Sequence, residues 1–418
     1  MTRTQFLGGK VTLYGGDCRD VLHSLPDCSV DSCVTDPPYG LGFMGRAWDA
    51  KDGAAFAMDL WAEVLRVLKP GGHVVAFSGT RTYHRMACAI EDAGFDIRDQ
   101  LAWAYGSGFP KSHDVSKAID KGAGAQREVV GYRASEGSGV AGRAPRDSSG
   151  SHIWSGQLRS KAAATEAARQ WEGWGTALKP SFEPICLARK PFRGTVAENV
   201  LQHGTGALNI DGCRIEGEPW QAHRATGLAA KKFFSDGVAA EIDKAPHSGG
   251  RWPANLCHDG SDEVIACFPE TAPARSGKPR AGKNGDGWGM TATGAEYDDN
   301  GGSAARFFYT AKADASDRIG TKHPTVKPVD LMQWLVRLTT PKGGTCLDPF
   351  AGTGTTGEAA WREGMRCILV EREEEYLADI ARRMDLAEKP TKRAAVAKTK
   401  GQLRGAEGTP LFGGEVSP

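Results

Sequence analysis

The sequence lacks the features that mark zinc-binding, secreted and membrane proteins. None of its ten cysteines belongs to a Cys-x-x-Cys pair, and no histidine lies at a spacing that would complete a zinc site. No apolar run approaches the roughly 20 residues that span a bilayer, and residues 1–10 lack the charged-then-apolar pattern of a signal peptide. We therefore expect reduced thiols, no metal, no membrane contact and a cytoplasmic location.

The sequence also lacks an excess of charge of either sign. Its 52 Lys and Arg and 51 Asp and Glu give a net charge of +1, so no global basic field attracts nucleic acid. Positive charge gathers instead between residues 106 and 193, where 14 Lys and Arg against 8 Asp and Glu leave +6. Trp171 and Trp174 lie in this segment. The pattern favours a local nucleic-acid patch, with a solvated flexible insert as the alternative.

Strand-like and helical patterns alternate along the chain. The strand-like stretches are residues 11–14, 30–34, 73–77, 101–105, 183–191, 344–347 and 366–370. Helical spacing of apolar residues covers residues 55–68, 82–92, 329–338, 355–363 and 374–383. This alternation predicts an α/β fold with a doubly wound, mostly parallel sheet covered by helices on both faces.

The segment Thr35-Asp36-Pro37-Pro38-Tyr39 directly follows the predicted strand 30–34. Consecutive prolines have no N–H and a fixed φ, so their carbonyls remain free acceptors on a stiff backbone. The Asp36 carboxylate beside the Pro37 carbonyl forms a two-acceptor clamp for an amino group, and the Tyr39 ring can lie on a planar base. The segment predicts a site for an exocyclic amine, with a proline-rich turn as the alternative.

A glycine-rich loop follows the predicted strand 344–347. Its spacing Gly352-x-Gly354-x-x-Gly357 meets the dinucleotide fingerprint, with Glu371 as the acid that accepts ribose hydroxyls. Asp348, which precedes the glycines, would repel a pyrophosphate and attract an ammonium group. A dinucleotide-dependent oxidoreductase is the rival interpretation of this loop.

Together the two motifs resemble the amino-group DNA methyltransferases that use S-adenosylmethionine, whose signature is Asp/Asn/Ser-Pro-Pro-Tyr/Phe. With the clamp first and the glycine loop last, the chain resembles their beta class. The resemblance implies a Rossmann-like methyltransferase sheet in which the catalytic residues are Asp36, Pro37, Pro38 and Tyr39. It implies that the cofactor is bound by Asp348, Pro349, Phe350, Gly352, Gly354 and Glu371.

Two further sites concern the same cofactor. Asp17 lies at the carboxyl end of the predicted strand 11–14, where the resemblance places a carboxylate on the cofactor's adenine, and an N-cap is the alternative role. Thr325 and Lys327 precede a helix that begins near Pro328, and this positive end suits a carboxylate such as that of methionine. His-Pro-Thr-x-Lys-Pro also resembles the beta-class segment before the glycine loop.

The glycine-rich stretch 40–49 predicts a mobile loop that closes over a bound base, with Arg46 and Trp48 on DNA; an ordinary surface loop is the alternative. The segment 195–320, which the resemblance identifies as the target-recognition region, contains no standard DNA-binding signature. We expect double-stranded DNA as the partner, with the chain acting alone or as a homodimer.

The expected organisation is a catalytic core that carries a large inserted target-recognition region. Its parts are residues 1–110 (catalytic half), 111–178 (basic insert), 179–194 (returning core strand), 195–320 (recognition region), 321–386 (cofactor half) and 387–418 (disordered tail).

In the resembling family Asp-Pro-Pro-Tyr goes mostly with adenine, so the expected product is N6-methyladenine in DNA. The alternatives are N4-methylcytosine, methylation of RNA or of a protein glutamine, and a non-catalytic DNA-binding protein.

Overall fold

The computed structural model describes residues 2–42, 49, 53–108, 112–134, 154–159, 162–215, 250–272, 301–312, 316–323 and 325–389. These residues form two compact units, one within 1–106 and 182–390 and the other within 107–181. The larger unit is not divided further, so a separate recognition region at 195–320 stays a prediction. The predicted tail falls almost entirely outside the described residues.

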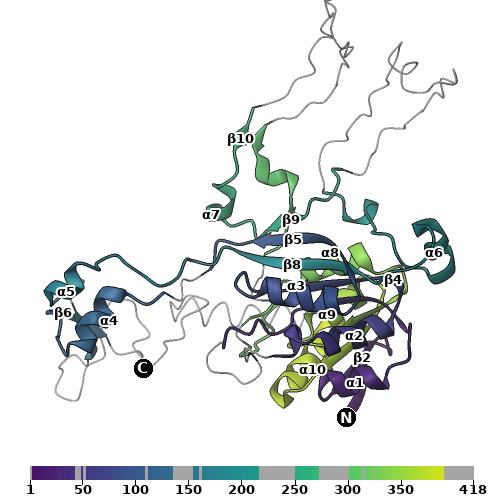
Figure 1. Ribbon diagram of the computed structural model, residues 1–418, viewed down its shortest axis with the longest axis horizontal. Coiled ribbons are helices and arrows are strands. Elements are labelled where there is room, and N and C mark those ends of the chain that lie inside the picture. The colour runs from purple at the N-terminus through teal and green to yellow at the C-terminus, as the bar shows by residue number, and fades with distance from the viewer. Residues whose placement is uncertain are drawn as a thin grey trace, which may run out of the picture. The chain divides into compact units, whose positions relative to one another are not determined.

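The larger unit is built on a ten-stranded sheet with the order β1-β2-β14-β13-β3-β4-β8-β5-β9-β12 (Figure 1). The strands are β1 (Thr2–Phe6), β2 (Val11–Gly15), β3 (Val30–Thr35), β4 (Leu68–Phe77), β5 (Asp96–Ala104), β8 (Phe182–Arg189), β9 (Leu256–His258), β12 (Tyr309–Thr310), β13 (Thr345–Asp348) and β14 (Arg366–Glu371). Neighbouring strands are parallel, except that β1 is antiparallel to β2 and β8 is antiparallel to both β4 and β5. The predicted mostly parallel α/β sheet is confirmed.

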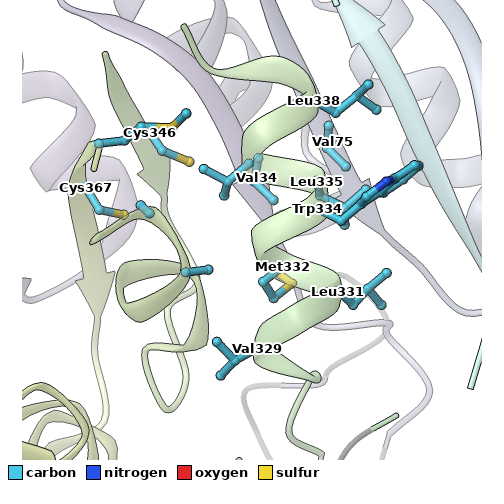
Figure 2. Close-up of a cluster of buried hydrophobic side chains, with 14 of the residues drawn as sticks. Val34, Val75, Val329, Leu331, Met332, Trp334, Leu335, Leu338, Cys346 and Cys367 are labelled. Atoms are coloured by element: carbon cyan, nitrogen blue, oxygen red, sulfur yellow. The ribbon is translucent and has the colours of Figure 1, made fainter. Parts of the chain in front are cut away.

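Helices cover both faces of this sheet because its strands alternate their apolar side chains. Cys33 of β3 and Val74 of β4 belong to one buried cluster with α1 (Cys18–Ser24), α2 (Met58–Val67) and α3 (Tyr83–Asp92). Val34 and Val75 belong to a second cluster with α8 (Val329–Thr339), α9 (Thr355–Arg362) and α10 (Glu374–Glu388). Figure 2 shows α8 presenting Leu335 and its other apolar side chains to this second cluster.

The remaining elements of the larger unit are short. They are η3 (Ala54–Phe56), α6 (Val196–His203), η4 (Asp211–Cys213), α7 (Asp262–Ile265), β10 (Glu270–Thr271), β11 (Gly302–Ser303) and η6 (Ala304–Phe307). All ten cysteines are free, and seven of them are buried. Within the described part of the chain, every helix is too short or too polar to cross a bilayer.

Several elements are longer than their sequence patterns predict, and β4 and α10 are two of them. The strand expected at 73–77 begins at Leu68, because Gly71 and Gly72 exchange backbone hydrogen bonds with Lys190 and continue the ladder. The helix expected to end at Arg383 continues to Glu388, because Met384 and Leu386 are buried.

The smaller unit contains α4 (Val115–Gly122), α5 (Glu166–Arg169) and an antiparallel pair, β6 (Val129–Ala134) and β7 (Trp154–Arg159). Its centre is Asp120, which accepts hydrogen bonds from Arg127 Nε at 2.7 Å and from the backbone N–H groups of Ala164 and Thr165 at 3.0 Å. These contacts join α4 to the start of α5. Within the described residues of this unit, α4 and the start of α5 are therefore held together by hydrogen bonds.

Candidate active site

The two sequence motifs meet at the carboxyl ends of adjacent parallel strands. β3 and β13 pair in the register Cys346 to Ser32 and Leu347 to Cys33, so the residues that follow both strands lie at one edge of the sheet. Thr35 Oγ1 donates a hydrogen bond to Asp348 Oδ1 at 2.6 Å, although the two residues are 313 positions apart. This edge is where doubly wound sheets bind their ligands.

A cavity of about 280 Å³ opens at this edge. It is lined by nearly all the predicted site residues that the structure describes, namely Asp17, Asp36, Pro37, Pro38, Tyr39, Thr325, Lys327, Asp348, Pro349, Phe350, Gly352 and Glu371. Gly354 does not line the cavity, and the predicted DNA contacts Arg46 and Trp48 lie outside the described residues. The amine clamp and the glycine loop therefore share one cavity.

The clamp is part of a four-residue hydrogen-bond cluster. Asp36 Oδ2 accepts from Lys327 Nζ at 2.6 Å, and Asp36 Oδ1 lies 2.9 Å from the Tyr39 hydroxyl. That hydroxyl lies 3.0 Å from Glu183 Oε2, which is 3.2 Å from Lys327 Nζ. We call Asp36, Tyr39, Glu183 and Lys327 the clamp cluster; with both carboxylates ionised its net charge is −1.

Electrostatics keep the polar groups of the clamp cluster in defined protonation states. Burial raises the pKa of the Tyr39 phenol well above its usual value, and Asp36 and Glu183 raise it further, so the phenol is neutral. Burial opposes the charge on Lys327, but Asp36 and Glu183 outweigh it and hold the lysine pKa above its usual value. Burial also raises the pKa of Glu183, and the attraction of Lys327 offsets only part of that increase.

Lys327 has a partner that the sequence did not indicate. We expected it to bind the cofactor's carboxylate from the start of α8, and that role stays a prediction. Its side chain is 6% exposed, and its ammonium is paired with Asp36 and Glu183. Glu183 itself was missed as a site residue. The sequence feature that could have identified Glu183 is its position as a carboxylate at the start of the apolar strand β8. Thr325 lines the cavity, and its role toward the cofactor stays a prediction.

Asp348 is held in place by hydrogen bonds to both of its oxygens. Oδ1 accepts from Thr35 and from the backbone N–H of Phe350, and Oδ2 accepts from Thr356 Oγ1 at 2.6 Å. The residue is only 2% exposed. Burial raises its pKa to about 6, because the hydrogen bonds from Thr35 and Thr356 offset the loss of water only in part. Asp348 thus fixes the loop as well as lining the cavity.

The glycine loop is joined to β14 by Glu371. Gly352 adopts φ +52° and donates its N–H to Glu371 Oε2 at 2.8 Å, while Glu371 Oε1 accepts from the backbone N–H groups of Arg372 and Glu373 at 2.9 Å. Burial raises the pKa of Glu371 to about 7. Three backbone N–H groups thus hold this carboxylate at the end of β14, where it can accept hydrogen bonds from hydroxyl groups.

The other glycines of the fingerprint have packing roles. A Cβ at Gly357 would lie 2.7 Å from Leu369 Cδ1, so only glycine lets α9 approach β14. Gly354 is the N-cap of α9 at φ +78°, with Ile380 Cγ1 3.1 Å from where its Cβ would be. Gly354 also donates its N–H to the carbonyl of Ala351 at 2.7 Å, and its predicted role in binding the cofactor stays a prediction.

A buried arginine supports the loop from behind. Arg383 of α10 is fully buried and donates to the carbonyl of Thr353 at 2.6 Å and to Glu358 Oε2 at 3.0 Å. Burial lowers its pKa to about 10, so it remains charged. The helical pattern placed Arg383 at the end of a helix and gave no indication of this contact.

Asp17 is confirmed as an N-cap. Its carboxylate accepts from the backbone N–H of Arg19 at 2.9 Å at the start of α1. The same side chain lines the cavity, so capping and ligand binding are compatible. Its contact with an adenine amine stays a prediction.

Asp348→Asn should change how stability depends on pH. Because the pKa of Asp348 rises from the ordinary value near 4 to about 6 in the folded protein, the folded state binds this proton more tightly and loses stability as pH rises through that window. Asparagine has no such charge. Relative to the Asn variant, the wild type should lose roughly 1 kcal/mol of unfolding free energy between about pH 5 and about pH 7.5. Urea unfolding at both pH values measures this, and parallel pH dependences would refute it.

A protein-family model described as DNA methylase (N6_N4_Mtase) matches residues 30–133 and 148–382. These ranges include both strands that carry the motifs, the clamp cluster and the glycine loop.

Curated relatives align over parts of the chain. Type II methyltransferase M.HindIII of Haemophilus influenzae is 30% identical over 156 residues, which is 36% of this chain and 38% of the relative. Type II methyltransferase M2.DpnII of Streptococcus pneumoniae is 47% identical over 64 residues, 15% of this chain and 24% of the relative. The chain thus spans less than two fifths of the length of either. Among solved structures, PvuII DNA methyltransferase (cytosine-N4-specific) superposes with a TM-score of 0.43 at 14% identity, over 98% of both chains.

Proposed function

Because the chain belongs to the N6/N4 DNA methylase family, we propose that it transfers the methyl group of S-adenosylmethionine to the exocyclic N6 of adenine in DNA. The observation that carries the proposal is the contact of 2.6 Å between Asp36 Oδ2 and an amine nitrogen, Lys327 Nζ, at the edge of the cavity. This contact supports a role for the Asp36 carboxylate as an acceptor from a nitrogen donor. Family membership disfavours the dinucleotide oxidoreductase.

The described residues of the cavity fit S-adenosylmethionine. Glu371 offers its carboxylate to the ribose hydroxyls, and Asp17 offers an acceptor to the adenine amine. Gly352 brings its backbone to the cavity without a side chain, at a φ that favours glycine. When bound, the cofactor supplies an electrophilic methyl group on sulfur. The binding residues orient it and exclude water.

The clamp then prepares the target nitrogen. Asp36 and the Pro37 carbonyl accept the two amine hydrogens, which draws the nitrogen away from conjugation and directs its lone pair toward the methyl group. The net charge of −1 on the clamp cluster stabilises the positive charge that develops on nitrogen. Tyr39 contributes its ring to hold the base. An adenine inside a duplex cannot reach this geometry, so the base must rotate out of the stack.

We place the DNA contacts in two parts of the chain. One is the loop with Arg46 and Trp48, because this glycine-rich stretch directly follows the amine clamp in the sequence. The other is the basic segment 106–193, in which Trp171 is 44% and Trp174 60% exposed and their rings lie 5.2 Å apart. Exposed aromatic rings among basic residues suit phosphates and unstacked bases.

The product should be N6-methyladenine. The support for adenine is the Asp-Pro-Pro-Tyr form of the clamp, which in this family goes mostly with adenine, while its geometry serves either amine. Purified protein is incubated with genomic DNA and S-adenosylmethionine, and the nucleosides are analysed by mass spectrometry. N6-methyldeoxyadenosine supports the proposal. N4-methyldeoxycytidine without it would refute the choice of base and leave the family's chemistry in place.

A further inference from the structure

The Tyr39 hydroxyl bridges two carboxylates. It lies 2.9 Å from Asp36 Oδ1 and 3.0 Å from Glu183 Oε2. A phenol has one hydrogen and can donate it to one carboxylate at a time. Two short oxygen contacts to a neutral phenol therefore form a path along which a second proton can pass, from one carboxyl through the hydroxyl to the other.

The two ends of this path lie in different surroundings. Asp36 and Tyr39 line the cavity, whereas Glu183 belongs to β8 and is not among the residues that line it. The Glu183 side chain is 18% exposed and the Asp36 side chain 24%, so either carboxylate can exchange a proton with water while the cavity is empty. Asp36 itself will be covered when a base occupies the clamp.

We propose that Glu183 is the final acceptor of the proton that the methylated amine loses, and that the Tyr39 hydroxyl relays it from Asp36. This inference rests on the proposed function and adds a role for Glu183 in it.

The proposed step conserves atoms and charge. The target nitrogen forms its bond to the methyl carbon while the carbon–sulfur bond breaks and its electron pair stays on sulfur, which leaves the nitrogen with one proton too many. Asp36 takes that proton. It passes the proton from Oδ1 to the Tyr39 oxygen while the Tyr39 hydrogen moves to Glu183 Oε2. Asp36 is again a carboxylate, Tyr39 is neutral, and Glu183 is protonated until water removes its proton.

The charges around Glu183 suit a proton acceptor. Lys327 Nζ faces it at 3.2 Å, and its other titratable neighbours are Asp36, Tyr39 and the phenol of Tyr105, which directly follows β5. Burial raises its pKa above the ordinary value, and the nearby Asp36 charge raises it too, whereas Lys327 keeps it ionisable. A more basic carboxylate holds a transferred proton better, and it must be ionised to receive one. The rate should therefore rise with pH through the pKa of Glu183.

The test compares Tyr39→Phe, Glu183→Gln and the double variant in full-length protein. Single-turnover methyl transfer is measured with saturating DNA and S-adenosylmethionine across a pH series. Phenylalanine keeps the stacking ring and removes only the relay hydroxyl. Each single variant should be slower by about tenfold or more and should lose the rise of rate with pH. The double variant should be within about twofold of the slower single variant, because both changes interrupt one path.

Two matched controls remove equivalent groups elsewhere. Tyr309→Phe removes a hydroxyl that donates to the Asp330 carbonyl at 2.9 Å, and Glu198→Gln removes a carboxylate from the capping box of α6. Both should keep the wild-type rate and pH profile. S-adenosylhomocysteine affinity, measured by calorimetry, should be unchanged in every variant. If Glu183→Gln no longer binds S-adenosylhomocysteine, the rate and pH profile of Tyr39→Phe alone test the relay.

The outcomes separate the relay from the proposed function. Absence of methyl transfer by the wild type refutes the proposed function and the relay with it. If the wild type is active and the rate loss of the double variant equals the product of the two single losses, Glu183 acts only through its charge. This result overturns the relay. Retention of the pH-dependent rise by either single variant overturns it too.

Discussion

Asp36→Ala should lower the single-turnover rate of DNA methylation by about 10³-fold or more, while the affinity for S-adenosylhomocysteine stays within about twofold of the wild type. In the proposed mechanism, the variant lacks the charged acceptor that orients the target amine and stabilises its developing charge. It leaves the glycine loop intact, since the described contacts of Asp36 are with Lys327 and Tyr39. Rapid-quench kinetics measure the rate, and calorimetry the affinity.

Asp36→Asn provides the matched control for charge. The amide keeps one acceptor oxygen and nearly the same shape, so its rate should fall between those of the wild type and the Ala variant. Lys327 retains Glu183 as a partner at 3.2 Å, which limits the loss of stability in both variants. Equal methylation rates for the wild type and Asp36→Ala would show that Asp36 does not take part in the reaction.

Gly352→Val should weaken S-adenosylmethionine binding by about 100-fold or more, which is about 3 kcal/mol. Gly352 has φ +52°, where a β-branched residue is strongly disfavoured, and its N–H holds Glu371 at 2.8 Å. The new side chain would also project toward His323 Nε2, which lies 3.6 Å from the ideal Cβ position. Calorimetric titration of the purified variant measures the loss.

Gly343→Val is the control for backbone strain alone. Gly343 has φ +70°, and a Cβ there meets no atom within 4 Å. It lies between α8 and β13 and does not line the cavity. Both variants should lose a similar amount of stability, roughly 1–2 kcal/mol, but Gly343→Val should bind the cofactor normally. Similar affinities for the two variants would contradict the assigned position of the glycine loop.

The sequence predicted those features whose physical cause is local. The two consecutive prolines after β3 and the glycine spacing after β13 restrict the backbone within a few residues, so Asp36 and Gly352 were identified as site residues from the motifs alone. Strand and helix patterns likewise predicted the sheet and its mostly parallel order, because apolar alternation and helical spacing are properties of short segments.

Contacts between distant segments were not predictable in the same way. Glu183 reaches Tyr39 because β8 enters the sheet antiparallel between β4 and β5, and no pattern near residue 183 specifies that order. Lys327 was expected to bind a cofactor carboxylate because it precedes α8, and nothing in that position indicated its ion pairs with Asp36 and Glu183. Arg383 looked like the end of a helix, although its guanidinium supports Thr353 from another element.

Transfer of a labelled methyl group to DNA tests the central claim most directly. Purified full-length protein is incubated with S-adenosylmethionine that carries a tritiated methyl group, in separate reactions with double-stranded DNA, RNA and a protein extract. The account predicts label in DNA, released as a methylated nucleoside, and background label in the other two. Label in RNA or protein with none in DNA, from protein that binds the cofactor, would contradict it.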